Sequence, residues 1–274
     1  MICANAAAAH TRLASLDELN LVKTFECGQC FRWQRLESGE YTGAADGKIL
    51  RIRQEASGIF CDCPDEDIPF WLNYFDLHVD YRSADELFTQ PEHLRKCAQY
   101  GAGIRILRQP PWEALCSFII SQCNNIPRIK KIIGTLCEGF GDDLGGGMFS
   151  FPDAGLIASL SESQLSPLRC GYRAAYILSA ARAVSEDRLN FDALTEMPPD
   201  EARAKLKTIN GIGDKVANCF MLYGLHRMDS FPIDVWMKRA LKLHFPSGFD
   251  PAPLGNWAGL AQQYIFFYER ENNK

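Results

Sequence analysis

The run Asn210-Gly211-Ile212-Gly213 constrains the fold of this chain more than any other segment. Residues 202–209 before it are good helix formers, and residues 214–223 after it again follow a helical pattern. Two glycines this close together permit backbone angles and close approaches that a Cβ atom would block. The sequence therefore predicts a helical hairpin. Such a hairpin can bind a phosphate through outward backbone N–H groups and the dipole of its second helix, although an ordinary tight turn is an alternative.

Lys215 lies in the first turn of the second predicted helix, beside Asp214. The helix dipole disfavours a cation at this end of a helix. A nucleophilic lysine must react as the neutral amine, so this position favours that role. The alternative is a lysine that is simply an exposed charge.

Asp234 follows nineteen residues later, within the apolar and proline-containing segment Phe231-Pro232-Ile233-Asp234-Val235. A carboxylate near an ammonium can orient it, accept its proton or stabilise a developing oxocarbenium ion. Asp234 can equally act as the N-cap of a helix over residues 235–243, and the two roles are compatible. Lys215 and Asp234 are the predicted catalytic pair.

The first hundred residues are predicted to be rich in β-structure and the remainder to be helical. Strands are expected over residues 30–36, 48–53 and 58–62. Helices are expected from Pro110-Pro111 onward, over 126–140 with Asn125 as N-cap, over 156–168, over 172–184 and near 257–268, with a loop at 141–147. The alanine-rich start, Met1 to His10, is typical of a frayed tail rather than of a signal peptide.

Composition restricts the class of protein. No stretch approaches the roughly 20 apolar residues of a membrane helix. Of the 11 cysteines, only Cys27 with Cys30 and Cys61 with Cys63 form close pairs, and neither has the second ligand pair at a set distance that a zinc site needs. This favours reduced, buried cysteines in an intracellular protein. The formal net charge is −5, but residues 201–242 carry eight basic and four acidic side chains. A local basic region can bind phosphates whatever the total charge is, although a solvated helix face is also common.

Five segments resemble those of one enzyme family in the same order. The hairpin with Lys215 and Asp234 resembles the signature of the helix-hairpin-helix DNA glycosylase superfamily. Four further segments resemble those of 8-oxoguanine DNA glycosylases: Gly28-Gln29-Cys30-Phe31-Arg32-Trp33, Ser121-Gln122-Cys123-Asn124-Asn125-Ile126-Pro127-Arg128, Gly171-Tyr172-Arg173-Ala174, and Ala261-Gln262 with Phe266. The chain is identified as a member of this family over roughly residues 25 to 267.

This resemblance implies an α+β fold, in which an antiparallel β-sheet N-terminal domain precedes two mainly helical domains. The implied domains are residues 1–104, residues 105–184 completed by 253–274, and the helix-hairpin-helix domain at 185–252. The active cleft is expected between the two helical domains.

The resemblance also implies roles for the residues that bind the base. The carbonyl of Gly28 would accept a hydrogen bond from N7–H of 8-oxoguanine, a proton that guanine lacks. Phe266 and Cys219 would stack on opposite faces of the flipped base, and Gln262 would form a hydrogen bond with its Watson–Crick edge.

A second set of roles concerns the DNA around the lesion. Tyr172 would insert into the DNA base stack at the position that the flipped base has left. The segment with Cys123 and Asn124, together with Arg128 and Arg173, would hold the orphaned cytosine. Gly211 and Gly213 would bind phosphate, and Trp236 would lie near a phosphate.

The sequence departs from the family pattern at two of these positions. Cys123 stands where an asparagine usually contacts the cytosine, so the preference for cytosine is expected to be weaker. Trp236 stands where the larger eukaryotic members have a histidine.

The expected function is excision of 8-oxoguanine from duplex DNA by a bifunctional DNA N-glycosylase and apurinic/apyrimidinic lyase, through a Schiff base on Lys215. No metal is expected in the chemistry. No C-terminal iron–sulfur cluster is expected, because no cysteine follows Cys219. Hairpin carbonyls can hold a structural cation. A monomer with no membrane partner is expected, in the nucleoid-containing cytoplasm or in a nucleus. The alternatives are a glycosylase for formamidopyrimidine or alkylated purines, and a non-catalytic DNA-binding module.

Overall fold

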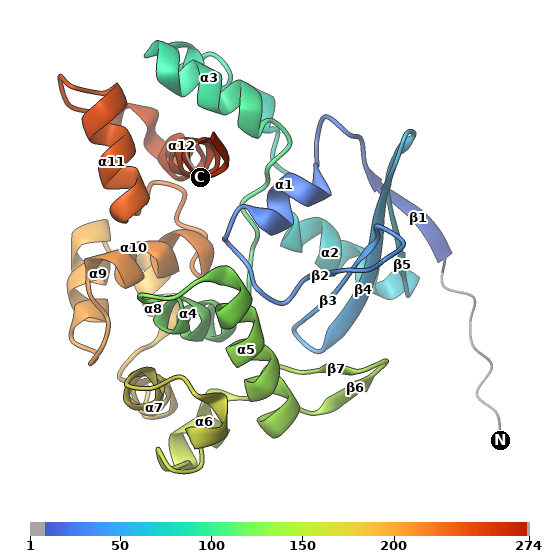
Figure 1. Cartoon of the computed structure of the whole chain (residues 1–274), viewed down its shortest axis with the longest axis vertical. Coiled ribbons are helices and arrows are strands. Elements are labelled where there is room, and N and C mark those ends of the chain that lie inside the picture. Colours follow the sequence, from blue (N-terminus) through green and yellow to red (C-terminus); the bar gives the residue numbers. More distant parts are fainter. Residues whose placement is uncertain (1–8, 273–274) are drawn as a thin grey trace.

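The computed structural model describes residues 9–272 and shows a β-sheet beside a larger body of helices (Figure 1). The expected frayed tail at residues 1–8 lies outside the described residues. Residues 9 and 10 belong to strand β1, so the frayed tail is wrong at its last two positions. No helix in the described part of the chain is long and apolar enough to cross a membrane.

A five-stranded antiparallel sheet forms the N-terminal part, with strand order β1-β5-β4-β3-β2. The strands are β1 (Ala9–Ala14), β2 (Gln34–Arg35), β3 (Tyr41–Ala45), β4 (Lys48–Glu55) and β5 (Gly58–Cys63). Along β4, Leu50 and Ile52 are buried while Arg51 between them is exposed, as the period-2 pattern predicts. The predicted strands at 48–53 and 58–62 are therefore confirmed, whereas the strand at 30–36 shortens to two residues.

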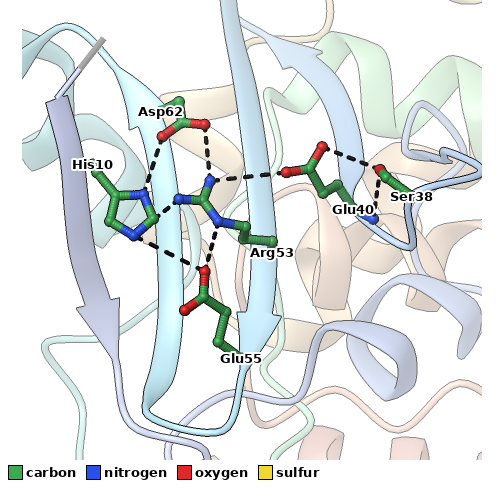
Figure 2. Close-up of polar contacts among 6 residues, drawn as sticks. All are labelled: His10, Ser38, Glu40, Arg53, Glu55 and Asp62. Atoms are coloured by element: carbon green, nitrogen blue, oxygen red, sulfur yellow. Dashed lines mark hydrogen bonds and ion pairs between the residues drawn. The ribbon is translucent and has the colours of Figure 1, made fainter.

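The two faces of this sheet differ in character. Helices α1 (Leu21–Glu26) and α2 (Ile68–Tyr74) bury an aromatic cluster on the inner face, where Phe25 stacks on Trp33 at 4.2 Å. The outer face carries charged side chains centred on Arg53 (Figure 2). Arg53 contacts Asp62 at 2.9 Å and Glu55 at 2.8 Å. The outer members of this network, His10 and Glu55, are exposed, so their ion pairs contribute little to stability.

Helices make up the rest of the molecule and enclose one continuous apolar core. They are α3 (Glu92–Gly101), α4 (Pro111–Ile120), α5 (Ile126–Phe140), α6 (Ala154–Ser159), α7 (Arg173–Ser185), α8 (Phe191–Glu196), α9 (Pro199–Lys207), α10 (Asp214–Tyr223), α11 (Val235–His244) and α12 (Ala258–Asn272). A short hairpin of β6 (Asp143–Gly145) and β7 (Met148–Phe149) extends from α5 toward the sheet (Figure 1). The α+β architecture predicted from the sequence is confirmed.

Most predicted helices are present, and two expectations are wrong. Asn125 caps α5 by accepting a hydrogen bond from the Arg128 N–H at 3.0 Å, as predicted. The expected helix at 156–168 is instead α6 followed by a turn, because Leu160 is extended and the Gln164 side chain binds the Ser161 N–H at 2.9 Å. The expected loop at 141–147 contains strand β6.

A histidine pair joins α3, α11 and α12. The rings of His93 and His244 stack at 3.6 Å between centroids, and their Nε2 atoms lie 2.9 and 3.3 Å from one carboxylate oxygen of Glu269. Burial lowers the pKa of His93, and the charges of His244 and Lys96 lower it further, whereas Glu269 raises it. The folded protein therefore favours the neutral form of His93.

This pair predicts a loss of stability in mild acid. The unfolded chain protonates His93 near its ordinary pKa of 6.5, above the lowered folded value. The unfolded state then binds more protons, so the free energy of unfolding should decrease as the pH falls from about 6.5 through the folded pKa. Urea unfolding between pH 8 and 5 should show a flatter profile for His93→Asn than for the wild type. The exposed His78→Asn is the control, and equal profiles for all three proteins would contradict the assignment.

Candidate active site

Lys215 lies where the N-terminus of α10 meets the C-terminus of α4. Its Nζ donates a hydrogen bond to Oγ of Ser121 at 3.1 Å and lies 5.5 Å from the centre of the Phe118 ring. Ser121 is the C-cap of α4, and its hydroxyl donates to the Phe118 carbonyl at 2.8 Å. The negative end of α4 and the ring face thus hold the half-buried ammonium in place.

Cys219 lies one turn further along α10 and presents a buried thiol beside the Lys215 amine. Burial raises the pKa of the Cys219 thiol, the positive charge of Lys215 lowers it, and the negative charge of Asp234 raises it again. The thiol is therefore kept neutral, as suits a surface against which an uncharged base could stack.

Asp234 caps α11, as the sequence predicts. Its Oδ1 accepts a hydrogen bond from the Met237 N–H at 2.9 Å, and its backbone is extended, with φ −101°. The hydrogen bond from the Met237 N–H fixes the orientation of the carboxylate. It uses only Oδ1, so Oδ2 can still interact with a substrate. Burial has the largest effect in raising the pKa of the Tyr223 hydroxyl, and the negative charge of Asp234 also raises it.

Gly28 reaches this region from the sheet domain. Its φ of +88° belongs to the left-handed region that favours glycine. A Cβ atom there would lie 3.5 Å from Cε1 of Phe266 and 3.9 Å from Cδ1 of Ile126. Three segments distant in sequence, those of Gly28, Ile126 and Phe266, therefore meet at one point, and two of the predicted base-binding residues lie together.

A buried chain of hydrogen bonds connects these segments. The Tyr223 hydroxyl donates to Oε1 of Gln263 at 2.6 Å and lies 3.2 Å from Oε1 of Gln262. Nε2 of Gln263 donates to the Cys27 carbonyl at 3.2 Å. Helix α10, helix α12 and the residue before Gly28 are thereby held at fixed separations.

The glycine hairpin joins α9 to α10 and adopts the conformation its glycines permit. Gly211 has φ +87°, and its carbonyl accepts a hydrogen bond from Nε2 of Gln122 at 3.1 Å. Gly213 is the N-cap of α10 and offers no side chain to its first N–H groups. These groups remain available for an anion, as a phosphate-binding hairpin requires.

The residues predicted to surround the lesion gather beside the hairpin. Tyr172 is 52% exposed and lies edge-on to Tyr176, whose ring packs over Gly211. Cys123 and Arg128 are also exposed, on the loop between α4 and α5 and at the start of α5.

Arg173 and Asn124 are instead engaged with the backbone. Arg173 is buried and donates to the carbonyls of Gln122, Cys123 and Cys170. Asn124 donates to the Ile120 carbonyl at 3.1 Å. Both side chains therefore shape this loop, and their contact with a cytosine stays a prediction, as does the phosphate contact of the half-buried Trp236.

Comparison with known proteins gives the family of the chain. The family described as 8-oxoguanine DNA glycosylase, N-terminal domain, matches residues 13–115. The family described as HhH-GPD superfamily base excision DNA repair protein matches residues 116–253. The chain belongs to the HhH-GPD superfamily of base excision DNA repair proteins.

Similar proteins place this HhH-GPD protein in the N-glycosylase/DNA lyase branch. An N-glycosylase/DNA lyase of Saccharomyces cerevisiae is 31% identical over 82% of this chain and 68% of its own length. MBOgg1, solved with a low-affinity DNA ligand, is 37% identical with a TM-score of 0.88, over 97% of this chain and 99% of that one. The Clostridium acetobutylicum 8-oxoguanine glycosylase/lyase, solved with double-stranded DNA, is 33% identical with a TM-score of 0.86, over 94% of each chain.

The sequence analysis gave no role to three residues of this HhH-GPD site. Their positions depend on tertiary packing, since Ser121 and Phe118 reach Lys215 from another helix. The three are Phe118, Ser121 and Tyr223.

The hairpin geometry predicts unequal effects of alanine at its two glycines. A Cβ on Gly211 would lie 2.1 Å from Cγ of Tyr176, at a φ of +87°. Gly211→Ala should therefore lower the free energy of unfolding by about 2–4 kcal/mol. Gly213 has open space around it, so Gly213→Ala should cost at most about 1 kcal/mol. Urea unfolding of both variants tests this, and similar losses would contradict it.

Proposed function

We propose that this protein excises 8-oxoguanine from duplex DNA and then nicks the strand, with the Lys215 amine as nucleophile. The observation that carries the proposal is the placement of Lys215 between Ser121 and Phe118, one helical turn from Cys219. A solvated lysine would need none of these contacts. The family membership and the relatives described as N-glycosylase/DNA lyases support the same reaction.

Base recognition would take place between Gly28, Phe266 and Cys219. The backbone around Gly28 is rigid, because the Gln29 side chain binds the Thr24 and Arg105 carbonyls at 3.0 and 2.8 Å. A fixed Gly28 carbonyl can accept N7–H of 8-oxoguanine. Guanine offers a lone pair there instead, and a buried acceptor left unpaired costs about 1–3 kcal/mol. Stacking on Phe266 would accept any purine. The Gly28 carbonyl would therefore supply the discrimination between 8-oxoguanine and guanine.

The covalent step would proceed by substitution at C1′ of the everted nucleotide. The lone pair of the neutral Lys215 amine forms an N–C1′ bond while the glycosidic bond breaks, and the electrons of the glycosidic bond leave with the base. The proton lost by the Lys215 nitrogen passes to the departing base anion. The Asp234 carboxylate would stabilise the positive charge that develops on the sugar. The nitrogen lone pair then breaks the C1′–O4′ bond, O4′ takes up a proton, and a Schiff base results. Transfer of a C2′ proton to water or to the excised base expels the 3′ phosphate and nicks the strand. Amine and carboxylate supply this chemistry without a metal ion.

The DNA would lie across the hairpin and the start of α7. Gly213 and the first N–H groups of α10 would bind a backbone phosphate without reading sequence. Tyr172 is exposed above Tyr176 and would fill the space left by the everted base. Gly213 directly precedes the helix of Lys215, and the Tyr176 ring beside Tyr172 packs on Gly211, so binding and chemistry would use neighbouring parts of the protein.

Lys215→Gln tests the reaction itself. Borohydride reduces a Schiff base to a stable adduct, so wild-type protein should be trapped on duplex DNA containing 8-oxoguanine. Lys215→Gln should give no adduct while retaining DNA binding, and its excision rate should fall by at least about a hundredfold. The matched control is Lys205→Gln, an exposed lysine on α9, which should be trapped like the wild type. Tight binding of the wild type without trapping would support a non-catalytic DNA-binding module instead.

Ser121→Ala tests how the amine is positioned. The variant removes the hydroxyl that accepts the Lys215 hydrogen bond but leaves the Phe118 ring in place. We expect the single-turnover excision rate to fall by about tenfold, the effect of losing one hydrogen bond to a charged group. Ser117→Ala on the same helix serves as control. An unchanged rate in Ser121→Ala would show that Ser121 does not position the nucleophile.

A further inference from the structure

Helix α12 carries an arginine in line with the two residues proposed to bind the base. Gln262, Phe266 and Arg270 are spaced by four residues, which places them on one face of an α-helix. Gln262 and Phe266 face the site between α10 and Gly28. Arg270 therefore continues the same face one turn beyond Phe266.

The Arg270 guanidinium is held by partners on one side only. Nη2 donates to the Glu26 carbonyl, and Nη2 and Nε lie 3.1 and 3.3 Å from Oε1 of Glu271. Nη1 is buried and has no hydrogen-bond partner among the residues that the structure describes. A buried donor of a charged group is seldom left unpaired, because the loss of its water is not compensated.

The unpaired nitrogen points to Gly28. A Cβ atom on Gly28 would lie 3.2 Å from Nη1 of Arg270 and 3.5 Å from Cε1 of Phe266. The donor thus borders the space left by the absent side chain of Gly28, next to the ring proposed to stack on the base. In the proposed complex, the purine atom nearest Gly28 is N7, and the exocyclic oxygens O8 and O6 flank it on either side.

We propose that Arg270 determines specificity by donating a hydrogen bond from Nη1 to an exocyclic carbonyl oxygen of the lesion base, beside N7–H. This inference rests on the proposed function. The Gly28 carbonyl would then accept a hydrogen bond from N7–H, while Arg270 donates one to the adjoining oxygen. The two residues together would recognise the donor and acceptor pattern of an oxidised purine. Because Nη1 is closed off from solvent in the free protein, the side chains that cover it must shift as the base enters.

Arg270→Met tests this contact, because methionine retains an unbranched apolar side chain without the donor. Single-turnover excision of 8-oxoguanine should slow by about ten- to hundredfold, the effect of losing a charged hydrogen bond. Borohydride trapping on a duplex with a preformed abasic site has no base to recognise and should change by less than about twofold. The exposed Arg95→Met on α3 is the control and should match the wild type in both assays.

The two assays separate a base contact from a structural role. Equal losses in both would show that Arg270 only supports the fold, and an unchanged excision rate would show that it does not contact the base; either result overturns the proposal. Arg270→Lys, which keeps the charge, should fall between methionine and the wild type in excision alone. If the wild type itself failed to excise 8-oxoguanine, the proposed function would be refuted before this inference.

A second lesion identifies the oxygen. 8-Oxoadenine keeps N7–H and O8 but carries an amino group in place of O6. Binding to a duplex with each lesion is measured relative to binding to a duplex with a tetrahydrofuran abasic site. If O8 is the acceptor, Arg270→Met should weaken this relative binding for both lesions. Weakening with 8-oxoguanine alone assigns the contact to O6. Weakening with neither overturns the proposal.

Discussion

The buried amide of Gln263 fixes the geometry on which the whole site depends. It accepts a hydrogen bond from Tyr223 at the end of α10 and donates one to the Cys27 carbonyl beside Gly28. Gln263 is fully buried, so losing either partner would leave a polar group unpaired in the core, at a cost of about 1–3 kcal/mol. The helix that carries Lys215 and the loop that carries Gly28 are thus held at a fixed distance by the core rather than by the surface.

The sequence specified the local structure well because local signals were strong. Asn125 as N-cap predicted the start of α5, the glycines predicted the hairpin between α9 and α10, and alternation predicted β4. The expected helix at 156–168 failed because local side-chain bonds at Ser161 and Gln164 compete with helical hydrogen bonds. No periodic pattern marked this break, since its apolar residues still recur at helical spacing.

The candidate site was predictable only in part, for a different reason. Lys215 and Asp234 stand in a segment with its own signature, and local context singled them out. Ser121 contacts Lys215 across 94 positions, and Arg270 donates to the Glu26 carbonyl across 244. Contacts at such separation are set by packing of the whole core, and neither residue has an unusual local sequence. Sequence analysis therefore identifies the reactive residues more easily than it identifies the residues that position them.

The loop that would face the opposite strand shows how a substitution is accommodated. Arg173 is buried and binds the carbonyls of Gln122 and Cys123, so it fixes the backbone of this loop. Cys123 has φ +47°, a left-handed conformation that asparagine adopts more readily than cysteine. A thiol is also a weaker hydrogen-bond donor than an amide. On the proposed function, the loop keeps its shape through Arg173 while Cys123 gives up polar recognition, so preference for the base opposite the lesion would depend on the exposed Arg128.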